Sequence, residues 1–341
     1  MSHLSYRPNK DRTFMGLCNS NQWARLNMYA DDGAVYVNCL NGNNGWVSFD
    51  NTLFVPESET LIDVDSGVGF QNSWINYGVT WEYVSYYKDN EGNVFLSGIA
   101  KNGTMDAYIF TLPSGYRPQS TNTLFCCESG GGFGRLDVVS GGGVDPRTGV
   151  NTRYSLDGVR FPTVGSWTAP SYQNGWGNYS DAWGPPGYWK DGNGLVWLRG
   201  LVSGGTIGQS CFTLPVGSRP PKRLLLPAIS WTTNYVLTRL DILPTGAVNC
   251  QAGGNSWFSL WGACFYAATE QSDQIPKLVP NWVTYDTTYT KEEAKIRNNK
   301  LVDVYGMVKS GTEPGDVFYL PSKVEDAEAE AQPIEGYYKI P

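Results

Sequence analysis

The chain has 341 residues and a net charge of −7; it holds 40 glycines and 20 prolines, 14% of its residues are aromatic and 17% are charged. Gly and Pro interrupt helices and aromatic side chains favour strands, so this composition excludes a helical bundle and indicates short strands joined by tight turns. The single histidine, His3, lies in a polar N-terminal stretch. This argues against catalytic triads, metal centres and proton shuttles that depend on histidine.

Charge, cysteines and hydropathy narrow the function classes further. The acidic balance, with no Lys/Arg-rich run, argues against nucleic acid and anionic membranes as partners. The seven cysteines are an odd number with no CxxC pair, so we expect free, mostly buried thiols. The polar N-terminus and the lack of an 18-residue apolar run argue against a signal peptide and against membrane insertion, so we expect a protein that is made in the cytosol and stays soluble. No enzyme activity, metal or cofactor is predicted.

The first repeated element, here called the B half, begins near the N-terminus and occurs three times. Each copy opens on an Arg-Pro motif, continues with Arg-Leu-Asn/Asp 18 to 20 residues after that first Arg, and ends on a Phe. Residues 135–139 and 154–161, with a Gly-rich turn between them, read as strands of the second copy. The three copies run from Tyr6-Arg7-Pro8 to Phe54, from Tyr116-Arg117-Pro118 to Phe161, and from Ser218-Arg219-Pro220 to Phe265.

The second repeated element, the A half, also occurs three times. It starts at Trp74, Trp176 or Trp282, has a glycine 24 residues later, and ends on Leu-Pro. Alternating apolar residues and Asn-Gly or Asp/Gly turns predict three strands, at 81–87, 94–99 and 107–112 in the first copy. Residues 291–300 have helical propensity, but they align without a gap with the strand region 85–94, and propensity is the weaker signal, so a strand is predicted there as well.

These halves predict an all-β fold of three antiparallel β-sandwich-like modules. Complete modules occupy 74–164 and 176–267, whereas 1–55 is a lone B half and 281–321 a lone A half. A lone half would expose sheet edges and an apolar face, so 281–321 should pair with 1–55 to give a third module. Pairing within one chain closes a ring with approximate threefold symmetry; the alternative, pairing between chains, gives a swapped oligomer or filament.

The three copies act as an internal control, because a feature present in every copy serves the fold and a feature of one copy is free to serve a site. The Arg135/Asp137 and Arg239/Asp241 pairs recur, so we interpret them as structural. Asp63, Asp65, Asp181 and Asp303 resemble glycosidase carboxylates or calcium ligands, but the stretch Asp63-Val-Asp65-Ser-Gly lacks the further oxygen ligands of a calcium loop, and no metal site is predicted. Trp167, Trp231 and Trp261 have no counterpart of the same type, and Trp189 replaces Tyr87.

Those four tryptophans are the candidate carbohydrate or receptor-binding residues, since an exposed indole can stack on the apolar face of a sugar ring. The alternative is that Trp167, Trp189, Trp231 and Trp261 pack between modules or against a partner chain. Sequence alone leaves both open.

Several stretches carry a family resemblance, namely 188–201 (YWKDGNGLVWLRGL), 204–208 (GGTIG), 212–220 (FTLPVGSRP) and 238–246 (TRLDILPTG), together with 111–118 and 155–161 in the preceding module. They resemble the repeated β module of tailed-bacteriophage tail-fibre and related virion proteins. The resemblance implies a multimeric particle component without catalysis by the module itself, and it transfers no site residues, because the shared positions are turn and core positions.

We therefore expect a virion structural protein of a tail fibre or baseplate, with a host-surface glycan as a further partner in host attachment. Its expected protein partners are other tail or capsid proteins, either as a homo-oligomer or docked on a trimeric partner. A capsid decoration protein (head fibre or cement) and a free carbohydrate-binding module are the alternatives. The acidic stretch 322–341 cannot build a core, so it is predicted to be an extended tail whose Tyr337, Tyr338 and Ile340 dock on a neighbouring subunit.

Overall fold

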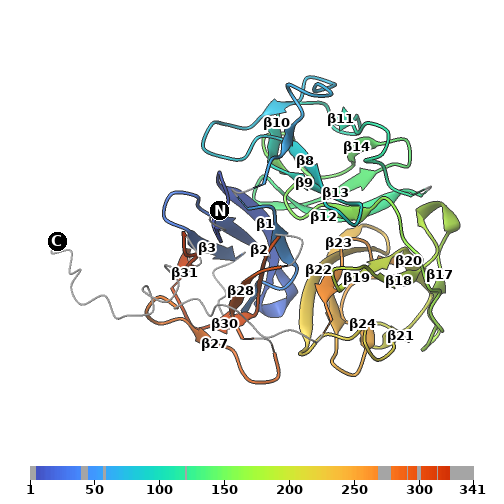
Figure 1. The fold of residues 1–341 in the computed structure, drawn as a ribbon. Helices are drawn as coiled ribbons and strands as arrows, with labels where there is room; N and C mark the ends of the chain where they lie inside the picture. The colour runs from blue at the N-terminus through green and yellow to red at the C-terminus, as the bar shows by residue number, and fades with distance from the viewer. Residues whose placement is uncertain are drawn as a thin grey trace.

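A computed structural model of the chain describes residues 5–39, 45–56, 59–119, 121–267, 278–289, 291–297, 301–312 and 314–322. These residues form an all-β ring of three modules (Figure 1), each built from a seven-stranded antiparallel sheet and a smaller second sheet. The predicted fold class is confirmed. Two short 3₁₀ turns, Asn19–Asn21 and Asp181–Trp183, interrupt the strands.

Module II is formed by one continuous stretch of the chain, whose strands lie between residues 62 and 162. Its large sheet has the order β11-β14-β13-β12-β15-β10-β7 and its second sheet the order β16-β9-β8-β6. The strands of the large sheet are β7 (Ile75–Asn76), β10 (Ile99–Lys101), β11 (Phe110–Thr111), β12 (Thr123–Ser129), β13 (Gly132–Val138), β14 (Gly143–Pro146) and β15 (Tyr154–Ser155). Those of the second sheet are β6 (Ile62–Asp63), β8 (Ser85–Lys88), β9 (Asn93–Ser97) and β16 (Arg160–Pro162).

Module III repeats this topology strand for strand, with the orders β17-β20-β25-β22-β23-β24-β21 and β18-β19-β26. Its large sheet contains β17 (Gly177–Asn178), β20 (Leu201–Ser203), β21 (Ser210–Thr213), β22 (Leu224–Trp231), β23 (Tyr235–Ile242), β24 (Ala247–Cys250) and β25 (Trp257–Ser259). The second sheet contains β18 (Gly187–Lys190), β19 (Leu195–Arg199) and β26 (Cys264–Tyr266). Strand β6 has no counterpart among the described strands here, so it is an addition to module II.

Module I is assembled from the two ends of the chain, with the orders β27-β30-β4-β1-β2-β3-β31 and β28-β29-β5. Its N-terminal strands are β1 (Arg12–Cys18), β2 (Gln22–Met28), β3 (Ala34–Cys39), β4 (Val47–Ser48) and β5 (Thr52–Phe54). The C-terminal strands are β27 (Val283–Thr284), β28 (Glu293–Ile296), β29 (Val302–Tyr305), β30 (Met307–Lys309) and β31 (Gly315–Tyr319).

The two half-modules pair within one chain at three places, between β4 and β30, β3 and β31, and β5 and β29. The blue and red strands of Figure 1 lie side by side for this reason. Intrachain closure, predicted from the repeat, is confirmed. The strand β28 also shows that repeat position overrides helical propensity at Glu293–Ile296.

The recurring residues define each module by close packing. The tryptophan that opens each A half is buried, namely Trp74, Trp176 and Trp282. Each indole lies against a glycine that comes two residues after the end of a strand. An added Cβ at these glycines, Gly103, Gly205 and Gly311, would lie about 2 Å from the indole. A side chain at these glycines would displace the tryptophan, so glycine is required there.

The repeated Arg-Pro motif also has a structural role. The Nε–H groups of Arg7, Arg117 and Arg219 donate to the carbonyls of Leu320, Leu112 and Leu214 at 2.8, 2.9 and 2.9 Å. These carbonyls belong to the Leu-Pro motif that ends each A half. The two sequence motifs therefore recur together because one binds the other.

A serine from each module closes the ring. Ser48 Oγ of module I donates to Leu225 O of module III at 3.1 Å. Ser259 Oγ of module III donates to Leu124 O of module II at 3.2 Å. Ser155 Oγ of module II donates to Thr13 O of module I at 2.7 Å, which completes the circle of contacts. The same contact used head to tail three times gives closed pseudo-threefold symmetry.

Each module has its own buried apolar core, and three further apolar clusters fill the junctions between modules. All seven cysteines are free and six are buried, as predicted. No helix in the described part of the chain is long and apolar enough to cross a membrane.

Candidate functional site

The charged pairs that recur between modules are structural contacts at the junctions. Arg135 binds Asp137 through two hydrogen bonds of 2.8 and 2.7 Å, and Arg239 binds Asp241 through bonds of 2.6 and 2.7 Å. The Arg135 guanidinium also lies 5.0 Å from the centre of the Trp183 ring across the junction. Burial raises the pKa of Asp137 to about 6, although Arg135 lowers it. In these two pairs the carboxylates of Asp137 and Asp241 are bound by arginine.

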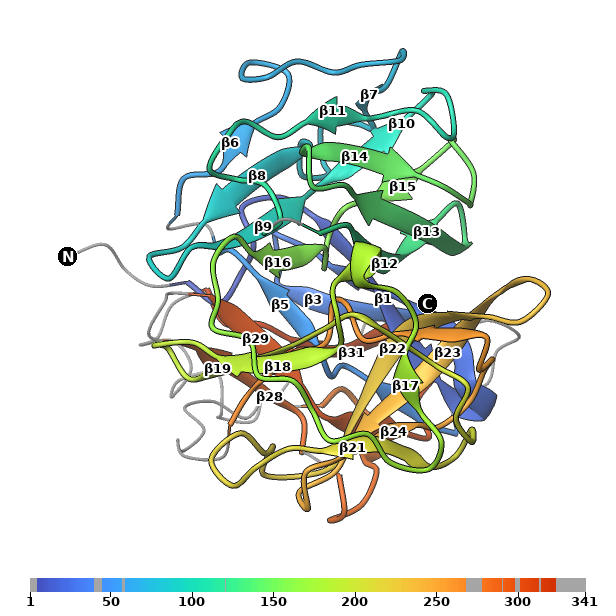
Figure 2. The same cartoon turned by 90° about the vertical axis from the view of Figure 1, so that its right-hand side faces the viewer.

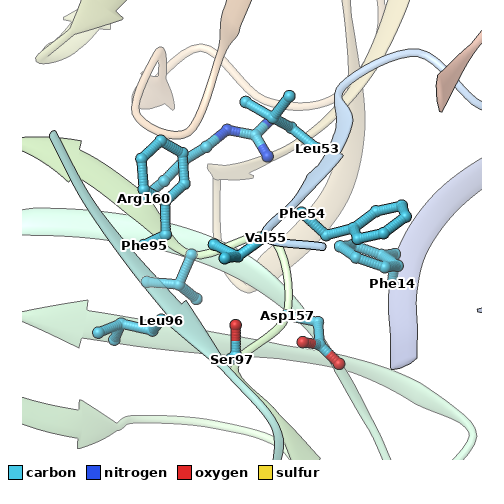
Figure 3. A pocket seen from close by; sticks show the side chains of 11 residues that line it. Phe14, Leu53, Phe54, Val55, Phe95, Leu96, Ser97, Asp157 and Arg160 are labelled. Atoms are coloured by element: carbon cyan, nitrogen blue, oxygen red, sulfur yellow. The ribbon is translucent and has the colours of Figure 1, made fainter. Parts of the chain in front are cut away.

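The described cavities between modules are small. One of about 10 Å³ lies between modules I and II and is lined by side chains that include Phe14, Phe95 and Arg160 (Figure 3). A second, of about 20 Å³, is lined by Met15, Cys126 and residues from all three modules. These volumes hold a water molecule at most, so neither cavity is a ligand site.

An open hollow of about 340 Å³ lies on module II beside β6, lined by Asp63, Asp65, Asn76 and Tyr83 among others. Asp63 Oδ1 accepts the backbone N–H of Asp65 at 2.7 Å, which makes this an Asx turn. The described residues contain no group of three or more His, Cys, Asp or Glu side chains placed to hold a metal ion.

Three of the four candidate tryptophans meet at the junction of modules II and III. Trp167 lies in the segment between the modules, and an isolated bridge from Thr168 to Tyr188 of β18 places it beside Trp189. The ring of Trp167 is 6.1 Å from that of Trp189 and 6.3 Å from that of Trp261. Trp167 and Trp189 are half-buried, and β18, the strand that carries Trp189, lies on the face turned toward the viewer in Figure 2.

Trp261 packs against Trp167 of this pair. It is buried, and its Nε1–H donates to the carbonyl of Trp183 at 2.7 Å. The aspartates Asp50 and Asp157 occupy the matching positions in modules I and II. Trp261 is therefore a packing residue of the site and has no surface to offer a ligand.

A cation completes the cluster. The Arg199 guanidinium, from the end of β19, lies 4.4 Å from the centre of the Trp167 ring, and its Nε–H donates to Pro185 O at 3.1 Å. Partial burial lowers the pKa of Arg199 to about 10. On the other side, Trp167 Nε1–H donates to Gln119 Oε1 of module II at 3.3 Å. The aromatic surface is thus flanked by a guanidinium and a primary amide.

The remaining candidates lie apart from this cluster. Trp231 is half-buried at the β22–β23 hairpin, where its ring is 4.5 Å from that of Tyr235 and packs on the II–III junction. The predicted docking residues Tyr337, Tyr338 and Ile340 lie outside the described residues. Interface packing, the alternative considered for the tryptophans, applies to all four: Trp231 and Trp261 pack at the II–III junction, and Trp167 and Trp189 pack on an apolar cluster shared by the three modules while staying partly exposed.

Sequence reasoning missed Arg199 and Gln119. The signal for Arg199 was present, because the matching positions hold Ser97 in module II and Tyr305 in module I. Gln119 offered the same signal, because the matching positions after the other two Arg-Pro motifs hold Asn9 and Pro221.

Comparison of the chain with protein-family models, with curated proteins and with solved structures found no match.

Proposed function

We propose that this chain is a structural protein of a tailed-bacteriophage particle, in the tail fibre or baseplate, that binds a host-surface saccharide. The observation that carries this proposal is a contrast between residues that recur in every module and residues that occur in one module. Positions that recur in all three modules are committed to packing and ring closure, as with Ser48, Ser155 and Ser259. The half-buried indole pair Trp167 and Trp189, with Arg199 beside it, lies at the II–III junction, whereas the I–III junction carries a tyrosine pair, Tyr285 and Tyr289.

The ring geometry supports a place on a particle. A pseudo-threefold body can be seated on the end of a trimeric fibre, because each module offers a similar face to one chain of the trimer. The resemblance of the repeated stretches to tail-fibre modules points to the same assembly. Half-buried indoles beside polar side chains suit saccharide rings, which have an apolar face and polar edges.

Binding is tested with the purified full chain on immobilised bacterial envelope polysaccharides. We expect retention on the host's polysaccharide and loss of retention in Trp189→Ala and Trp167→Ala. Tyr319→Ala is the matched control, since Tyr319 is an exposed aromatic residue of module I. Retention unchanged by either tryptophan substitution, or lost equally in Tyr319→Ala, contradicts the assignment of the site.

Location is tested with a density map of the parent particle. Density for the ring at the tail tip or baseplate supports the proposal, whereas density on the head favours the capsid decoration alternative. Absence from the particle, together with polysaccharide binding, favours a free carbohydrate-binding module. Release of oligosaccharides from the polysaccharide, abolished by replacing an Asp/Glu pair, would contradict a non-catalytic protein.

A further inference from the structure

Arg199 differs from the other stacked arginines of this protein. Five described arginines lie over aromatic rings, and four of them have an aspartate partner: Arg135 with Asp137, Arg223 and Arg239 with Asp241, and Arg297 with Asp303. Arg199 has no carboxylate partner among the described residues. Its positive charge is therefore left uncompensated at a half-buried position.

The hydrogen-bonding capacity of Arg199 is also largely unused. A guanidinium has five N–H donors, and here the Nε–H donates to Pro185 O. No described protein group accepts from the two terminal NH₂ groups, and these groups are not enclosed. Such a fork matches the two oxygens of a carboxylate in a bidentate arrangement.

Two glycines lie close to this side chain. Gly184 and Gly187 flank the guanidinium: a Cβ at Gly184 would lie 3.7 Å from Arg199 Cδ, and one at Gly187 would lie 3.5 Å from Arg199 Nε. The partly exposed rings of Trp167 and Trp189 lie next to it.

From this juxtaposition of an unpaired guanidinium and two partly exposed indoles, we infer that the site binds a carboxylate-bearing sugar of the uronic acid class. The sugar ring packs on the aromatic surface and its carboxylate accepts from Arg199. A singly charged carboxylate suits one guanidinium, whereas a doubly charged phosphate requires further cations, and no second cation is placed at this site among the described residues. The inference rests on the proposed saccharide-binding function and specifies its ligand class.

The test compares methyl uronides of the gluco, galacto and manno series with their methyl esters, using isothermal titration calorimetry and the full chain. Esterification removes the negative charge and leaves the ring unchanged. We expect the preferred uronide to bind about 10- to 100-fold more tightly than its ester, the range for a hydrogen bond to a charged group. Added salt should weaken binding of the uronide and leave binding of the ester unchanged.

Two variants distinguish binding of the carboxylate by Arg199 from a general attraction between the protein's positive charges and the uronide. Arg199→Gln should abolish the preference for the uronide over the ester while keeping the affinity for the ester. Lys309→Gln, which removes a cation placed over Tyr285 on module I, should keep the preference. Inorganic phosphate should not compete with the uronide.

The failures are distinguishable. Equal binding of uronide and ester, or a preference retained in Arg199→Gln, overturns this inference and leaves the saccharide-binding proposal intact. Competition by phosphate overturns the carboxylate assignment. Binding of neither sugar form, combined with no retention on envelope polysaccharides, overturns the proposed function and this inference with it.

Discussion

A buried ion cluster at the junction of modules I and II provides a stringent test of how the ring is held together. Arg12, the first residue of β1, is fully buried. Its terminal nitrogens lie 3.2 Å from Asp157 Oδ1 and 3.1 Å from Glu82 Oε2, both in module II. The matching positions of Arg12 are Thr123 and Leu224, so the repeat itself does not require an arginine here. We predict that Arg12→Leu, a near volume-conserving change, destabilises this junction.

The expected loss follows from the two carboxylates that remain. Removing one partner of a buried ion pair costs about 3–5 kcal/mol, because the other charge stays buried without compensation. Burial already raises the pKa of Glu82, and Arg12 opposes that rise, so removing Arg12 raises the pKa further. Carboxylates with raised pKa bind protons more readily in the folded than in the unfolded protein. The deficit of the variant should therefore shrink as pH falls from about 7 to about 5.

Urea-induced unfolding of the full chain, followed by tryptophan fluorescence and circular dichroism, measures this loss at both pH values. The variant Arg12→Leu/Glu82→Gln/Asp157→Asn is the control, since it removes the orphaned charges and should recover most of the stability. A deficit below about 1 kcal/mol at neutral pH, below the range for a buried pair, would refute the reasoning. A deficit that does not change with pH would refute the electrostatic cause.

Two further predictions concern single positions. Gly98 has φ +89°, and an added Cβ would lie 2.3 Å from Tyr83 O, whereas Gly69 has φ +78° and open space around it. Gly98→Ala should therefore lower the free energy of unfolding by well over the ~1–2 kcal/mol expected of Gly69→Ala. Equal losses in the two variants would contradict the steric argument. Burial raises the pKa of Asp50 from 3.8 to about 7, although the N–H groups of Leu225 and Gly306 lower it. Folded protein then holds an extra proton on Asp50 between pH 4 and 7, so wild type should lose about 4 kcal/mol of stability relative to Asp50→Asn as pH rises through that window. A difference between the two proteins that is constant with pH would contradict this.

The fold could be predicted from the sequence because the repeat is carried by residues that touch each other. The tryptophan that opens each A half packs on a glycine of the same half, and the Arg-Pro motif of each B half binds the Leu-Pro carbonyl of an A half. Such pairs recur at fixed spacing, so alignment of the copies also showed that the first and last halves complete each other.

The site was harder to predict because it forms where the repeat is broken and where segments far apart in sequence converge. Trp167 comes from the segment between modules, Arg199 from β19, and Gln119 from module II. No spacing rule links these positions. Equally, nothing in the sequence indicates that Trp261 is buried under Trp183 while Trp167 keeps part of its ring exposed.

The centre of the ring shows what joining three modules in one chain makes possible. Leu53, Arg160 and Cys264 occupy matching positions on β5, β16 and β26. Arg160 Nε–H donates to Cys264 Sγ at 2.8 Å, and an NH₂ group donates to Asn51 O at 2.7 Å.

In a homotrimer of one module, matching positions would carry the same residue, and three buried arginines would repel one another without a carboxylate between them. A single chain can place a donor, an acceptor and an apolar residue there instead. The same freedom allows the II–III junction to carry Arg199 and Trp167 while the I–II junction carries the buried ion cluster of Arg12. A pseudo-threefold body built from one chain can therefore keep the symmetry of its backbone while each junction carries different side chains.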